Sequence, residues 1–189
     1  MSLKDADAAF ISLNPQPFPL PLGPWAEIVE AAFLGMNKRD WVLPGPRARI
    51  GATLRGCPAE RLIHPQAGAK PYKIGPSSMD PAARALHAVG LAMGSNQPTL
   101  VILGMAAEAN GALTEAYNLC SLTGAVVVFV LIRQELKDDA PIGRQSAADP
   151  RKLAAAYGLN TSTVSGSAVK KAVAKARESG KSTLIIANL

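Results

Sequence analysis

Apolar and polar positions follow two different patterns in the two parts of the chain. From Asp80 onward, short apolar runs alternate with segments whose apolar residues recur every three or four positions. Runs of the first kind predict strands covered on both faces, and segments of the second kind predict helices. The predicted strands are 99–103, 125–132, 163–164 and 183–186, and the predicted helices are 80–93, 111–122, 149–158 and 167–179. Strands that alternate with helices of this length predict βαβ crossovers and a parallel sheet.

Prolines interrupt the pattern in the first part of the chain. Of the 15 prolines, 12 lie in residues 1–81, and those at 15, 17, 19, 21 and 24 nearly alternate with other residues. Alternating prolines impose an extended, polyproline-like path, so we expect an extended arm over 1–23 with no helix in it. The pattern then predicts a helix over 24–36, a short strand within 40–46 and a short helix over 53–62. Residues 24–189 are expected to form one α/β domain of three layers, a parallel sheet with helices on both faces.

Composition narrows the functional classes. Hydrophobic residues make up 48% of the 189 residues and charged residues 18%, which does not fit disorder or a coiled coil. No apolar run reaches the length of about 20 residues that a membrane span needs, and the first residues lack the pattern of a secretory signal, so we expect a cytoplasmic protein that binds no membrane. The cysteines (Cys57, Cys120) and histidines (His64, His87) lack metal-site spacing, and we interpret both cysteines as structural.

The basic charge is localised. Residues 38–73 contain eight Lys or Arg and two acidic residues, a net charge of +6 that equals the charge of the whole chain. This segment is compatible with a solvated surface, with docking of an anion or acidic partner, or with nucleic acid. Only Trp41 and Tyr72 are available there for base stacking, so we expect no nucleic-acid binding.

Several segments together are similar to a known family. Residues 40–49 (DWVLPGPRAR) resemble the D-x-V-x-P-x-Y-R-x-H segment of thiamine-diphosphate-dependent 2-oxo acid dehydrogenases, in the α subunit of their decarboxylating component. Residues 104–118, with Glu115-Ala-Tyr-Asn118, resemble the family's G-D-G-A…E-A-x-N block. Further matches follow in the family's order at 55–56, 85–94, 154–158, 164–166 and 182–186. The resemblance covers about residues 23–187 and implies the thiamine-diphosphate-binding superfamily fold, a thiamine diphosphate cofactor and Mg²⁺.

The positions that match the family's cofactor pocket carry altered residues. They are Arg47, Arg49, Gly104, Met105, Ala106, Arg133 and Gln134. Met105 stands where the family has the Asp that binds Mg²⁺, and Arg133 and Gln134 replace its N-N pair; a thioether is a poor ligand for this hard cation. We therefore expect Mg²⁺ and diphosphate binding in the family's manner to be lost, with no metal site and no catalytic residue. Because the chain is shorter than the family's subunit, we expect its loop with an active-site His to be missing.

Four charged residues in these segments, two basic and two acidic, are further candidates for function. Arg133 at a strand end, together with Arg47, could bind a metal-free diphosphate or another anion, or could be a solvated surface residue. We interpret Glu108 as a partner of a helix N-terminus and Glu115 as a structural or interface residue.

The expected function follows from these changes. We expect a shortened α-subunit-like domain that does not catalyse on its own and acts as a structural, regulatory or anion-binding subunit. The alternative is a functional subunit of a 2-oxo acid decarboxylating dehydrogenase whose reshaped site a partner chain completes. Because the family's cofactor lies between two such domains, we expect a homo-oligomer or a hetero-oligomer with a β-type subunit, with the helices around 83–94 and 111–117 facing the partner.

Overall fold

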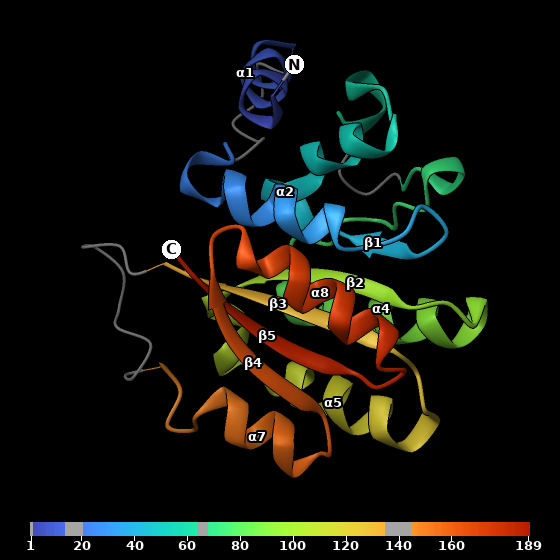
Figure 1. Ribbon diagram of the computed structural model, residues 1–189, viewed down its shortest axis with the longest axis vertical. Coiled ribbons are helices and arrows are strands. Elements are labelled where there is room, and N and C mark those ends of the chain that lie inside the picture. The colour runs from blue at the N-terminus through green and yellow to red at the C-terminus, as the bar shows by residue number, and fades with distance from the viewer. Residues whose placement is uncertain (1, 14–20, 64–67, 135–144) are drawn as a thin grey trace.

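The fold is built on a parallel sheet. The computed structural model describes residues 2–13, 21–63, 68–134 and 145–189. Within them, five strands form one parallel sheet in the order β1-β2-β3-β5-β4 (Figure 1). The strands are β1 (Trp41–Leu43), β2 (Thr99–Gly104), β3 (Val127–Arg133), β4 (Asn160–Ser165) and β5 (Thr183–Asn188). The predicted parallel sheet is confirmed, with strand bounds shifted by a few residues.

Helices cover both faces of this sheet (Figure 1). One face carries α4 (Pro81–Ser95), α5 (Gly111–Thr123) and α7 (Pro150–Ala156), and the other carries α2 (Ala26–Leu34) and α8 (Ala168–Glu178). The connections through α4, α5 and α7 run in one direction across the sheet, whereas α8 returns the chain from β4 to β5. Right-handed crossovers that run in opposite directions place their helices on opposite faces. The predicted three-layer architecture is confirmed, and the superfamily stays a prediction.

Helix α1 and several short helical segments complete the described structure. They are α1 (Leu3–Leu13), α3 (Gly45–Ala48), and the 3₁₀ turns η1 (Gly23–Trp25), η2 (Arg49–Arg55), η3 (Ala59–Leu62), η4 (Lys70–Tyr72) and η5 (Met105–Ala109). The short helix expected over 53–62 is thus divided between η2 and η3. Across the described ranges, no helix has the length and apolar character needed to cross a bilayer.

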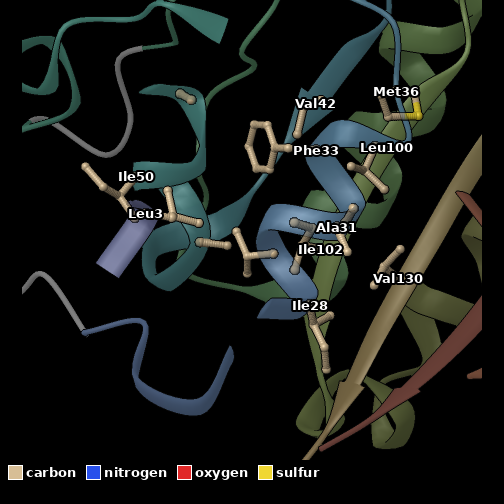
Figure 2. Close-up of a cluster of buried hydrophobic side chains, with 14 of the residues drawn as sticks. Leu3, Ile28, Ala31, Phe33, Met36, Val42, Ile50, Leu100, Ile102 and Val130 are labelled. Atoms are coloured by element: carbon tan, nitrogen blue, oxygen red, sulfur yellow. The ribbon is translucent and has the colours of Figure 1, made fainter. Parts of the chain in front are cut away.

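Alternate residues of the central strands pack into two cores. Figure 2 shows Ile28 of α2 in one apolar cluster with Leu100 and Ile102 of β2. The intervening residues Val101 and Leu103 pack on the opposite face, among the helices α4 and α5. Because side chains alternate along a strand, a strand buried on both faces needs an uninterrupted apolar sequence, as β2 and β3 have.

The prediction of an extended arm over 1–23 is wrong for its first part, which forms helix α1. Leu3, Ala6 and Phe10 recur at helical spacing and are buried against the domain. The amide of Asp5 donates to the Ser2 hydroxyl, and the Asp5 carboxylate accepts from the Ser2 amide, which stabilises the first turn. The prolines at 15, 17 and 19, on which the prediction of an extended path rests, lie outside the described residues.

Burial of Cys120 predicts a stability that depends on pH. The Cys120 side chain is buried in α5, and burial raises the pKa of its thiol from 9.0 to about 11. The unfolded thiol therefore ionises first, so this stabilisation is full below pH 9 and is lost as the pH rises toward 11. Between pH 8 and pH 10.5 we expect a loss of roughly 2 kcal/mol in the free energy of unfolding from this group. Urea unfolding should show a shallower loss in Cys120→Ala, and equal pH slopes in the two proteins would contradict the assignment.

Candidate functional site

A pocket opens at the carboxyl ends of β1, β2 and β3, where ligands bind in open parallel sheets. Its volume is about 360 Å³. Its walls come from segments far apart in the sequence: η1, the turn after β1, the start of α4 and the ends of β2 and β3. The lining residues are Trp25, Pro44, Gly45, Pro46, Arg47, Met79, Pro81, Arg84, Gly104, Met105, Ala106, Ile132, Gln134 and Gln145.

The structure brings together five of the seven residues that the sequence assigned to a pocket. Arg47, Gly104, Met105, Ala106 and Gln134 all line this cavity. They converge because β1, β2 and β3 are adjacent and parallel, so the residues that follow each strand meet at one edge. The other two residues, Arg49 and Arg133, are not among those that line it.

Arg49 is instead part of the packing between η2 and α1. Only 3% of the residue is exposed, and its guanidinium carbon lies 4.9 Å from the ring centroid of Phe10. Burial lowers the pKa of Arg49, and its Nε and Nη1 atoms have no hydrogen-bond partner within the described chain. The missed helix α1 supplies the ring that covers this arginine, which is why the sequence assignment to the pocket does not match the structure.

Arg133 is engaged in an ion pair rather than placed as a cation in the pocket. Its Nε and Nη2 atoms donate to the two carboxylate oxygens of Glu108 at 2.8 and 2.7 Å. The Glu108 side chain is only 1% exposed. Glu108 lies in η5, and the N-cap of α5 is Asn110, whose Oδ1 accepts from the Ala112 amide. The Glu108 carboxylate is thus engaged by Arg133, and its interpretation as a partner of a helix N-terminus stays a prediction.

Arg47 keeps a guanidinium at the pocket wall. Its guanidinium carbon lies 4.9 Å from the ring centroid of Trp25, a stacked geometry that orients the charge. The Trp25 Nε1 atom donates to the Gln134 side-chain oxygen at 2.9 Å, which connects η1 to the end of β3. In the part of the chain that the structure describes, no carboxylate lies within ion-pair distance of Arg47.

Arg84 is a second pocket cation, and the sequence analysis missed it. It lies on the first turn of α4 and is 5% exposed. Its Nη1 atom donates to the backbone carbonyl of Ser78 and its Nη2 atom to that of Ile102 at 3.3 Å, while Nε has no partner within the described chain. Burial lowers the pKa of Arg84 to about 10, and the charge of Asp80 partly offsets that shift, so the side chain is a cation at neutral pH.

The sequence pattern of the predicted helix contained evidence that could have identified Arg84 as a site residue. In the predicted helix over 80–93, Arg84 shares a face with Ala85 and Ala88, which are buried. A charged residue on the apolar face of a helix must reach a partner or a site, because an unpaired buried charge is costly. The evidence for Trp25 as a pocket residue was weaker, because an aromatic residue at helical spacing is usually a core residue.

The donor atoms of this pocket do not fit the family's Mg²⁺ clamp. Met105 offers a thioether, and the Gln134 oxygen accepts from Trp25. Among the residues described, no group of three or more His, Cys, Asp and Glu could hold a metal ion. A hard cation requires oxygen ligands, whereas two guanidinium groups attract an anion.

A scan against protein-family models and a search of curated proteins find no match to this chain.

Proposed function

We propose that this chain is an α-subunit-like domain of the thiamine-diphosphate-dependent 2-oxo acid dehydrogenase type that binds an anionic ligand without Mg²⁺ and is not catalytic on its own. The order of matching segments supports the family assignment, and the parallel sheet with helices on both faces is compatible with it. The altered positions Met105 and Gln134 support the loss of the metal clamp.

One observation carries the proposal for an anion. Arg47, which stands on the family's phosphate-binding segment, is stacked on Trp25 at the pocket wall and has no carboxylate partner within the described chain. A guanidinium presents its N–H donors in a planar fork that matches phosphate oxygens. A stacked arginine loses less conformational entropy when it binds a ligand, which favours this use over a solvated surface role.

Titration calorimetry with pyrophosphate tests this proposal. We expect binding in EDTA that added Mg²⁺ does not strengthen, and a Kd about fivefold higher in Arg47→Gln, because one charge-assisted contact is lost. Arg39→Gln is the matched control, since Arg39 is exposed and does not line the pocket. Thiamine diphosphate that binds only when Mg²⁺ is present would contradict the proposal and support the functional-subunit alternative.

We also propose that the outer surfaces of α4 and α5 face a second subunit, either another copy or a β-type chain. Gly90, Gly94 and Gly111 are exposed there, and a Cβ added at any of them would meet no atom within 4 Å. Small residues allow helices of two subunits to approach closely. Sedimentation of the purified chain distinguishes the two partners: a stable dimer favours self-association, and a monomer that dimerises only with a β-type chain favours the hetero-oligomer.

A further inference from the structure

Arg84 combines deep burial with a place on the pocket wall. The residue is 5% exposed, yet it lines the cavity at the end of β2. The carbonyl oxygens of Ser78 and Ile102 fix two of its nitrogen atoms. Of the five N–H donors of a guanidinium, these carbonyls and the Met79 carbonyl account for at most three. No carboxylate of the described ranges forms an ion pair with Arg84, so its hydrogen-bond partners are backbone carbonyls, and the charge of Asp80 acts on it from beyond ion-pair distance.

The backbone at Gly45 allows this guanidinium to reach the wall of the pocket. Gly45 has a φ of +73°, and a Cβ at this position would lie 2.7 Å from Cζ and 2.9 Å from Nε of Arg84. Any larger residue would displace the guanidinium. Gly45 and Arg47 belong to the same short helix, α3, so this segment contains one of the two cations and closely approaches the other.

Arg49 offers an internal comparison. It is as deeply buried as Arg84, and it too has no carboxylate partner within the described chain. Arg49 packs on Phe10 and does not line the pocket, whereas Arg84 does. Of these two buried arginines, Arg84 is therefore the one placed to contact a ligand in the cavity.

From these contacts, and resting on the proposed function, we propose that Arg84 and Arg47 together bind the phosphoryl group of a phosphate ester or diphosphate, and that Arg84 supplies charge compensation where the family uses a metal ion. A phosphoryl group carries close to two negative charges at neutral pH and offers three acceptor oxygens. Two guanidinium groups match that charge, whereas a carboxylate would leave one of them uncompensated. The apolar walls formed by Met79, Met105 and Ile132 suit the organic part of such a ligand.

The experiment measures pyrophosphate, phenyl phosphate and acetate binding by calorimetry in EDTA, with Arg84→Met, Arg84→Lys and the control Arg49→Met. We expect Arg84→Met to raise the Kd for pyrophosphate about 20-fold, because a buried charge-assisted contact is lost. Arg49→Met should stay within about threefold of the parent, and acetate should bind at least about tenfold more weakly than phenyl phosphate. Circular dichroism verifies that each variant is folded.

The outcomes separate this inference from the proposed function. If Arg84→Met binds pyrophosphate as the parent does while Arg47→Gln binds it weakly, the role of Arg84 is wrong and the proposed function stands. If the parent binds no phosphoryl compound, both are wrong. Should Arg84→Met fail to fold, Arg84→Lys and Arg84→Gln decide, because both side chains are polar and only lysine keeps the charge. Equal affinity for pyrophosphate in these two variants would overturn the inference, and weaker binding by Arg84→Gln would support it.

Discussion

Replacing Arg133 with methionine should lower the free energy of unfolding by about 3 kcal/mol, measured by urea denaturation at pH 7. Arg133 compensates a carboxylate that is almost inaccessible, because the Glu108 side chain is only 1% exposed. Methionine removes the charge and both hydrogen bonds, and it leaves the Glu108 carboxylate buried without its cation. The pair connects η5 to the end of β3, so the loss should also loosen the rim that positions Met105 and Gln134.

A double-mutant cycle distinguishes this explanation from a general loss of packing. The variant Arg133→Met with Glu108→Met should be more stable than Arg133→Met alone, because no uncompensated charge is left. The pair of Arg151 and Asp149 is the control: it is largely exposed, so Arg151→Met should cost much less free energy of unfolding than Arg133→Met. Equal, small effects at Arg133 and Arg151 would show that the Glu108 pair does not stabilise the fold.

The sequence predicted the architecture but not the order of all the strands. Apolar runs identified β2, β3 and β5 because each is buried on both faces. That β5 inserts between β3 and β4 depends on contacts across the sheet. Ser182 illustrates this: its hydroxyl accepts from the Val127 amide and donates to the Ala125 carbonyl, which ties the start of β5 to the start of β3. Such a contact joins positions more than fifty residues apart, so a local sequence pattern cannot predict it.

The candidate site was predictable where it follows strand ends and unpredictable where it depends on tertiary pairing. Gly104 and Gln134 follow from the positions of β2 and β3, which the apolar runs define. The ion pair of Arg133 required the position of η5, and the burial of Arg49 required helix α1. Arg84 lies in a helix that was predicted correctly, but only the fold shows that its first turn faces the pocket.

Several cations of the basic segment over 38–73 form hydrogen bonds and ring contacts within the fold, a role that composition did not suggest. Arg55 donates from Nη1 to the Asp40 carbonyl at 2.7 Å and from Nη2 to the Asn37 carbonyl at 3.1 Å. Arg49 packs on Phe10, and the ammonium of Lys73 lies 5.0 Å from the Trp41 ring centroid. Through these contacts, the three cations stabilise a segment that is mostly irregular in structure. Arg47 differs from them because it contributes to the pocket wall.

Replacing Gly45 with alanine should lower the free energy of unfolding by about 3 kcal/mol and weaken pyrophosphate binding. Two costs combine at this position. A φ of +73° is unfavourable for alanine, and the new Cβ would lie 2.7 Å from the Arg84 guanidinium carbon, which the carbonyls of Ser78 and Ile102 hold in place. Urea unfolding measures the stability, and calorimetry measures the affinity.

The variant Gly56→Ala distinguishes the two energetic costs, the unfavourable backbone conformation and the close approach to Arg84. The φ of Gly56 is +85°, but an added Cβ would meet no atom within 4 Å, so Gly56→Ala carries the backbone cost alone, about 1 to 2 kcal/mol. The excess at Gly45 then measures the contact with Arg84, and in an Arg84→Ala background this excess should disappear. If Gly45→Ala stays as costly in that background, the strain lies in the backbone of α3 and not against the guanidinium. An excess that disappears, accompanied by weaker pyrophosphate binding in the single variant, ties the close approach of Gly45 to the position of the charge that the ligand requires.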